Sequence, residues 1–201
     1  MLSALLGFPL ILIVGLVLLT LLGTNEPDDL RERPAMLYLS FMTLTGVLLL
    51  LFATVLAMTG LLHLTATHSG ALNHDADVSQ VVVGGIAGAA ALAVLRFHVP
   101  KLELGAEESA GPARRIFSRV VYVVCAAAAL TGLAAAAGCL YAIYGMVAPD
   151  TAGVGHTVDA VRSFIAAAVV AGVAALVFAR AWRRVEQPMV RRPTPAEGPA
   201  E

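Results

Sequence analysis

Charge is scarce in this sequence, and its scarcity argues against an ordinary soluble domain. Only 13% of the 201 residues are Asp, Glu, Lys or Arg, whereas soluble domains carry about 25%. The formal net charge is -1, so the chain also lacks the basic excess with which proteins bind nucleic acid. We therefore expect no nucleic-acid partner.

Cysteines and catalytic signatures are also scarce. Cys125 and Cys139 are the two cysteines, and in one helix they would lie roughly 21 Å apart, whereas a disulfide needs Cα atoms within about 7 Å. The sequence contains no GxSxG, HExxH, Walker or dinucleotide-binding signature. No predicted loop is long enough to fold as a catalytic domain. We therefore expect a protein that is not an enzyme and that binds no cofactor.

Long apolar stretches are what the sequence has in abundance, since 59% of its residues are hydrophobic. A helix needs about 20 such residues to cross the hydrocarbon core of a membrane. Five segments qualify: Leu2 to Gly23, Ala35 to His63, Val78 to Val99, Arg115 to Val147 and Val158 to Arg184. We interpret the first as a membrane helix rather than a cleaved signal peptide, because it is long and no basic residue precedes it.

The predicted fold is all-α, a polytopic bundle of five membrane helices in six segments. These are an N-terminal membrane helix (1–23), a cytoplasmic loop (24–34), a two-helix membrane unit (35–103), a cytoplasmic linker (104–113), a second two-helix membrane unit (114–186) and a disordered cytoplasmic tail (187–201). Pro34 and a capping box of Asp77 with Gln80 are expected to begin helices, and Pro100 is expected to end one.

The positions of the basic residues predict the orientation. Twelve of the thirteen Lys and Arg residues fall on one side of this arrangement, and Arg162 is the exception. Because basic residues collect on the cytoplasmic side, the N-terminus is expected outside and the C-terminus in the cytoplasm. The predicted location is the inner (plasma) membrane.

Small residues predict where helices pack closely, because they let two backbones approach each other in lipid. The candidate packing positions are Gly84, Gly88, Gly132, Gly138, Ala168 and Gly172. They fall in the third, fourth and fifth segments, whereas the first two are rich in Leu, Ile, Val and Phe. We therefore expect the third to fifth helices to pack tightly and the first two to face lipid.

The chain also has the pattern of an internal duplication. Arg33 to Tyr38 corresponds to Arg119 to Tyr122, His74-x-x-Asp77 corresponds to His156-x-x-Asp159, and the exit at Arg96 to His98 corresponds to that at Arg180 to Trp182. On these residues the chain resembles a bacterial family of tandem two-helix membrane units, a domain of unknown function, over about residues 33 to 186. The resemblance implies a four-helix membrane bundle and no known activity; His98 departs from it, standing where the second unit has Trp182.

Histidine and aspartate suggest the main alternative function. His68, His74, His156, Asp77 and Asp159 fall on the predicted outer side, and imidazole and carboxylate are ligands for zinc or copper. Their spacing fits no known metal motif, and loop solvation with helix capping explains them equally well. We therefore expect no bound metal. A haem shared by His63 and His98 is excluded, because these residues belong to opposite ends of the membrane.

The expected role is a non-enzymatic accessory or scaffold protein that acts through helix packing. No predicted membrane segment carries a charged residue near its midpoint, which argues against a proton-coupled transporter. The alternatives are a metal-binding sensor or carrier and a transporter of small solutes or lipids. The expected partners are the lipid bilayer and either another membrane protein or a second copy of the chain.

Overall fold

The described part of the chain is helical. The computed structural model describes residues 33–65, 74–108, 112–147 and 157–186, so the predicted helix from Leu2 to Gly23 lies outside it. The helices are α2 (Arg33–Thr65), α3 (His74–Glu108), α4 (Pro112–Val147) and α6 (Thr157–Glu186). All four are long and apolar enough to cross a membrane, as expected of a multi-pass integral membrane protein.

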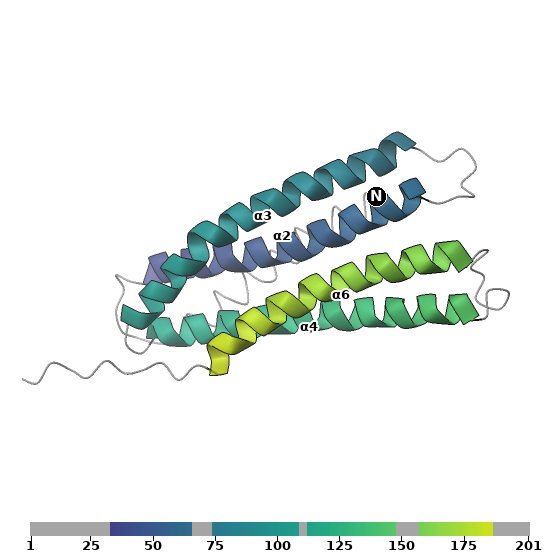
Figure 1. Ribbon diagram of the computed structural model, residues 1–201. Coiled ribbons are helices and arrows are strands. Elements are labelled where there is room, and N and C mark those ends of the chain that lie inside the picture. Colours follow the sequence, from purple (N-terminus) through teal and green to yellow (C-terminus); the bar gives the residue numbers. More distant parts are fainter. Residues whose placement is uncertain (1–32, 66–73, 109–111, 148–156, 187–201) are drawn as a thin grey trace, which may run out of the picture.

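These helices form two antiparallel hairpins that lie side by side (Figure 1). α2 packs along α3, and α4 packs along α6. One end of the bundle, called here the basic end, is where α2 and α4 begin and α3 and α6 end (Figure 1). The helix segments nearest to it contain Arg96, Lys101, Arg119, Arg180, Arg183 and Arg184. The opposite end, called the hairpin end, is where α2 and α4 end and α3 and α6 begin.

Each helix is longer than a membrane requires. The shortest, α6, has 30 residues and the longest, α4, has 36. At 1.5 Å per residue they extend for about 45 to 54 Å, whereas the hydrocarbon core is about 30 Å thick. The helices must therefore tilt or extend into the headgroup regions.

Large apolar side chains cover the outside of the bundle. Leu130, Leu133, Leu140 and Leu176 are between 68% and 72% exposed. In water, each Å² of apolar surface left exposed would cost about 25 cal/mol of stabilising free energy that burial would otherwise give. Acyl chains solvate the same surface well. The outward faces of the helices therefore suit a bilayer better than water.

The buried residues of α3 and α4 include a seven-residue repeat, most of whose members are small. Such a repeat keeps one stripe of each helix facing its partner when the two helices coil around each other. Buried positions recur at this interval in α3 and α4. They are Asp77, Gly84, Ala91 and His98 in α3, and Val121, Ala128, Ala135 and Ala142 in α4.

Among the described glycines, Gly84 and Gly60 come nearest to the backbone of a neighbouring helix, and both lie at the contact between α2 and α3. A Cβ added to Gly84 would lie 2.8 Å from the Ala57 backbone nitrogen and 3.0 Å from the Ala53 backbone oxygen. On α2, Gly60 approaches the Asp77 backbone oxygen in the same way, at 2.9 Å. The two backbones therefore touch at the hairpin end, where no larger side chain fits.

Two apolar clusters join the hairpins, and both include residues from the half of α2 nearest the basic end. The first contains Leu44, Val47, Leu51, Val120, Val124 and Ala174. The second contains Met36, Leu102, Phe117, Val121 and Cys125. The core of the four-helix bundle therefore lies in the half toward the basic end.

The expectation that α3, α4 and α6 pack tightly, while α2 is more exposed to lipid, was correct only for the packing of α4 along α6. α2 contacts all three other helices, whereas α3 has only slight contact with α4. A stripe of small residues within the leucine-rich α2, namely Gly46, Ala53 and Gly60, lies against α3. Larger α2 residues, Leu44, Val47 and Leu51, pack with residues of α4 and α6. Composition averaged over the whole helix concealed this stripe.

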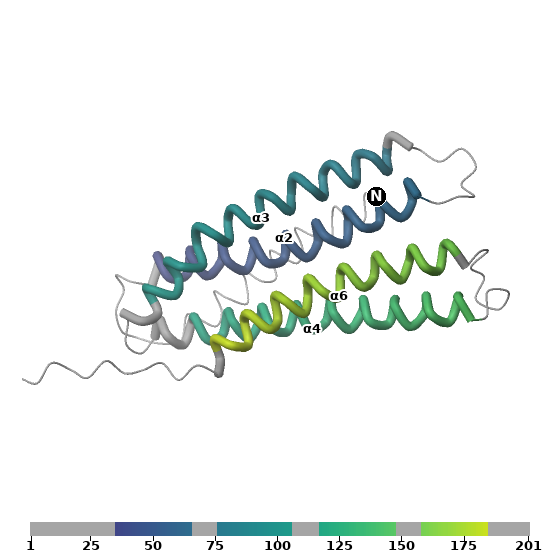
Figure 2. The backbone as a smooth tube through the Cα atoms, viewed as in Figure 1, coloured from purple at the N-terminus to yellow at the C-terminus, as the bar shows by residue number. Residues whose placement is uncertain are grey.

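Two predicted helix boundaries in α3 were also wrong. Pro100 does not end the helix, which continues to Glu108; α3 instead curves toward the basic end (Figure 2). Proline lacks the N–H that would bond the carbonyl of Arg96, and this loss bends a helix that packing holds on both sides. Asp77 is not a capping residue, because α3 begins earlier, at His74.

Gly84 and Gly85 offer a matched test of the α2–α3 contact. Gly84→Ala is expected to destabilise the protein by about 1–3 kcal/mol through overpacking against α2. Gly85→Ala should be neutral or slightly stabilising, because nothing lies within 4 Å of the added Cβ. Unfolding in mixed detergent micelles, followed by circular dichroism, measures both variants. Equal stability of the two would contradict the described contact.

Candidate functional site

The polar side chains that the structure brings together lie between helices. Three pairs of described residues connect one helix to another: His63 with Asp77, Tyr38 with His98, and Glu103 with Arg184. The first lies at the hairpin end, and the other two lie in the half toward the basic end. They are the candidate functional groups of the described chain.

The His63–Asp77 pair joins the end of α2 to the start of α3. His63 Nδ1 lies 3.2 Å from Asp77 Oδ1 and donates to this carboxylate oxygen, and the Asp77 side chain is only 9% exposed. Asp77 also stands in the first turns of α3, where the helix dipole favours a negative charge. The pair therefore fixes the hairpin end of the first hairpin.

The Tyr38–His98 pair joins the same two helices near their other ends. His98 is buried, and its Nδ1 lies 2.8 Å from the Val94 carbonyl oxygen, four residues earlier in α3. Because a carbonyl only accepts, Nδ1 carries a proton, and in the neutral ring Nε2 then accepts from the Tyr38 hydroxyl at 3.3 Å. The hydrogen bonds thus select one tautomer of His98.

The Glu103–Arg184 pair joins the two hairpins. Arg184 Nη2 donates to Glu103 Oε1 across 3.0 Å, from α6 to α3. Both side chains are partly exposed, at 44% and 24%, so the pair contributes at most about 1 kcal/mol. Its importance is geometric, because it connects two helices that otherwise have little contact.

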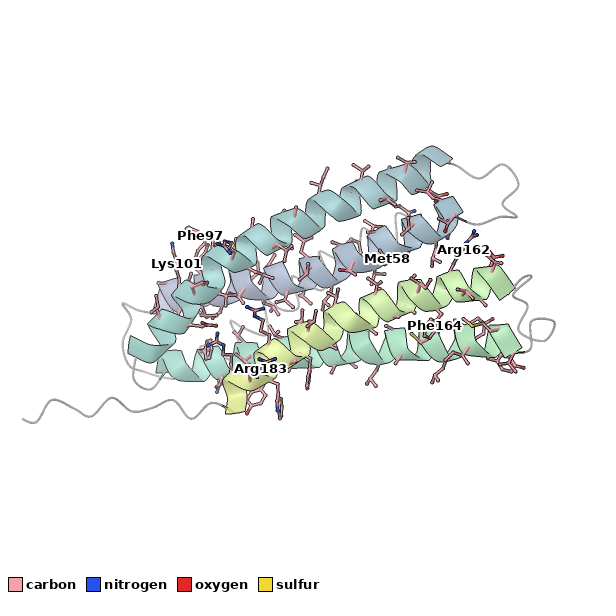
Figure 3. All side chains as sticks on the ribbon, in the orientation of Figure 1. Met58, Phe97, Lys101, Arg162, Phe164 and Arg183 are labelled. Carbon is pink, nitrogen blue, oxygen red and sulfur yellow. The ribbon has the colours of Figure 1, made fainter. Side chains whose placement is uncertain are left out.

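Basic and aromatic side chains lie together at the basic end. Lys101 Nζ lies 3.7 Å from the centre of the exposed Phe97 ring, and Figure 3 shows both on α3, with Arg183 on α6 at the same end. Trp182 stacks on Phe178 with their centres 5.8 Å apart. Amphipathic side chains of this kind are typical of a membrane–water interface.

The five predicted metal-ligand candidates fall into three groups. His68 and His156 lie outside the described residues, and His74 begins α3 with its side chain outside them too. Asp77 is engaged with His63. Asp159 contacts Arg162 on its own helix at 3.4 Å. Within the described ranges, no three His, Cys, Asp or Glu side chains come together as a metal site would require.

The six predicted packing positions also differ from one another. Gly84 lies at the close contact with α2. An added Cβ would lie 3.8 Å from the Ala53 side chain at Gly88, 3.7 Å from Ala174 at Gly132, and 3.4 Å from Ala167 at Gly138. At Gly172 it would meet nothing within 4 Å, and Ala168 is exposed. This last pair therefore faces away from the described helices.

Sequence reasoning missed the Tyr38–His98 and Glu103–Arg184 pairs. His98 had been considered only as a haem ligand with His63. His63 contacts Asp77, which lies 21 residues before His98 in α3. This spacing corresponds to about 31 Å along a helix, so His63 and His98 are too far apart to bind one haem. The signal for His98 was its place in a seven-residue series with Gly84 and Ala91.

Comparison of the chain with protein-family models, with curated proteins and with solved structures gave no match. Its fold and its candidate functional groups are therefore described from the chain itself. By these criteria it is a helical membrane protein in which three described pairs of polar side chains connect one helix to another.

Two acid–base pairs near the hairpin end allow a matched test. His63→Ala should lower stability by about 1 kcal/mol or more, because the buried Asp77 carboxylate loses its partner from α2. Arg162→Ala should cost about 0.5 kcal/mol or less, because its partner Asp159 lies three residues away on the same helix. Adding Asp77→Asn to His63→Ala should restore part of the loss. Thermal unfolding in detergent measures all three; equal losses in the single variants would show that the interhelical pair has no special importance.

Proposed function

We propose that this protein is a non-enzymatic accessory or scaffold component of the inner (plasma) membrane that acts through contacts between helices. The observation that carries this proposal is the use of polar groups in the described chain. The His63–Asp77, Tyr38–His98 and Glu103–Arg184 pairs each connect two helices. Side chains employed in this way support a role in holding a helical assembly together.

The spacing of the packing stripes supports a tandem pair of two-helix units, 35–103 and 114–186, as in the family that the sequence resembles. The small residues Gly46, Ala53 and Gly60 of α2 recur 82 positions later as Ala128, Ala135 and Ala142 of α4. The stripe of α3 recurs 83 positions later, as Ala160, Ala167, Ala174 and Ala181 of α6. Both helices of a unit thus repeat at nearly the same interval.

The complete arrangement that we propose has five spans, with Leu2 to Gly23 as the first. The clustering of Arg and Lys at the basic end supports a cytoplasmic position for that end. The hairpin end then faces outward, the N-terminus lies outside and the C-terminus lies in the cytoplasm.

Epitope tags at the two chain ends test this topology. In intact spheroplasts, an antibody should bind an N-terminal tag at once and a C-terminal tag only after permeabilisation. A tag inserted between residues 66 and 73 should be accessible from outside, because α2 ends and α3 begins at the hairpin end. Equal accessibility of the two terminal tags would contradict an odd number of spans.

The accessory role predicts a companion in the membrane, which is either another membrane protein or a second copy. Gly172→Leu should reduce co-purification of that companion from mild detergent if the contact uses the face of α6 that carries Ala168. The variant should fold normally, because an added side chain has open space around it. Tyr144→Leu, at an exposed site on α4, serves as a control at a different surface. A strictly monomeric natural protein without companions would contradict the proposed role.

A further inference from the structure

Three hydroxyl oxygens of α2 are buried without a hydrogen-bond partner among the described residues, those of Ser40, Thr43 and Thr45, and of these residues only Ser40 and Thr43 are buried as a whole. Ser40 is 0% exposed and Thr43 is 7% exposed. Neither side-chain oxygen has a hydrogen-bond partner among the described residues. Buried polar atoms in folded proteins are nearly always hydrogen-bonded, to the protein or to ordered water, so both groups require a partner.

Several threonine hydroxyl groups in these helices, unlike that of Thr45, find their partner within the helix. The hydroxyls of Thr54, Thr59 and Thr131 each donate to the carbonyl oxygen four residues earlier, at 2.8 to 2.9 Å. This is the usual arrangement for threonine in a membrane helix. Ser40 and Thr43 depart from it, although they lie in the same kind of helix.

The position of these two residues explains which neighbours surround them. Ser40 lies four residues after Met36 and four before Leu44, and Thr43 lies four before Val47, so all five residues share one face of α2. Met36 packs in one of the clusters that join the hairpins, and Leu44 and Val47 pack in the other. The hydroxyls are therefore buried where the hairpins meet.

The chemistry of the site determines what can bind there. The cluster residues that α4 supplies are Phe117, Val120, Val121, Val124 and Cys125, which offer no strong hydrogen-bonding group. Each hydroxyl provides one donor and two acceptor positions. A divalent cation needs several oxygen ligands, usually including carboxylates, and the buried members of the two clusters include no acidic residue. A small neutral molecule meets these conditions.

We propose that Ser40 and Thr43 bind an ordered water molecule at the contact between the two hairpins. Water has two donors and two acceptors and can serve both hydroxyls at once. The carbonyl oxygens of Met36 and Leu39, four residues before each hydroxyl, have second lone pairs for it. The contact between the hairpins is then partly polar in its centre, which strengthens association in lipid, where apolar burial alone drives it weakly.

Hydroxyl-radical labelling by an X-ray pulse tests this proposal, because radicals formed from bound water oxidise adjacent side chains inside a protein. The full chain in lipid nanodiscs is exposed to the pulse, and oxidation of Met36 is measured by mass spectrometry. Met36 is 3% exposed, so its labelling reports internal water. Met58, on the same helix toward the hairpin end (Figure 3), is the internal reference.

The variant pair Ser40→Ala with Thr43→Val removes both hydroxyls with little change in shape. It should abolish the labelling of Met36 relative to Met58, and it should lower the unfolding temperature by about 2–4 °C. Thr54→Val, which removes a hydroxyl bonded within its own helix, should leave the labelling of Met36 unchanged. The single variants Ser40→Ala and Thr43→Val provide the same readouts if the double variant does not fold.

Two results would overturn the proposal. Met36 labelling that persists in the variants lacking these hydroxyls would show that the oxidising water lies elsewhere, and absent labelling in the natural protein would show that the site is dry. An unfolding temperature that stays equal or rises when the hydroxyls are removed would show that they have no partner to lose.

Discussion

Inside a bilayer every peptide group must find its hydrogen-bond partner within the protein, and the rest of this structure depends on that constraint. It makes each apolar segment a continuous helix, and it keeps α3 helical beyond Pro100. It also removes the usual reason for helices to associate, because leucine is solvated as well by acyl chains as by another helix. The helices must therefore be held together by close contact and by polar groups.

The two hairpins divide these tasks along their length. Small residues at seven-residue intervals bring the paired backbones together, most closely where Gly84 meets Ala57. Polar pairs then fix the ends of the first hairpin, with His63 and Asp77 at one end and Tyr38 and His98 toward the other. Between the hairpins the contact is mostly apolar. Each hairpin is thus built as a unit, and the bundle is built from two of them.

The sequence was sufficient to predict the class of fold because hydrophobic length is a strong signal. Four of the five predicted spans fall on helices that can cross a membrane, and the fifth lies outside the described residues. Helix ends were harder to predict. Pro100 favours the end of a helix by its local chemistry, but the packing of Leu102 in the core stabilises a helix that continues past it.

The contacts were less predictable than the helices, because they depend on which residues share a face. Gly84 and Gly88 could be found from their spacing, whereas Gly46 and Gly60 were concealed by the leucines around them. Asp77 and Asp159 have similar local sequences, but one contacts the neighbouring helix and the other contacts its own. Tertiary contacts decide whether such a carboxylate pairs with a neighbouring helix or with its own. The local sequence pattern does not show these contacts.

The order of α2 and α3 in the chain has a consequence for biosynthesis. Both helices of the first hairpin, with their small-residue stripe and their two polar pairs, lie before residue 109. They can leave the ribosome, enter the bilayer and close on each other before α4 and α6 follow them into the membrane. The second hairpin then assembles beside a pair of helices that is already formed, so four separate helices never have to find their partners in the membrane at the same time.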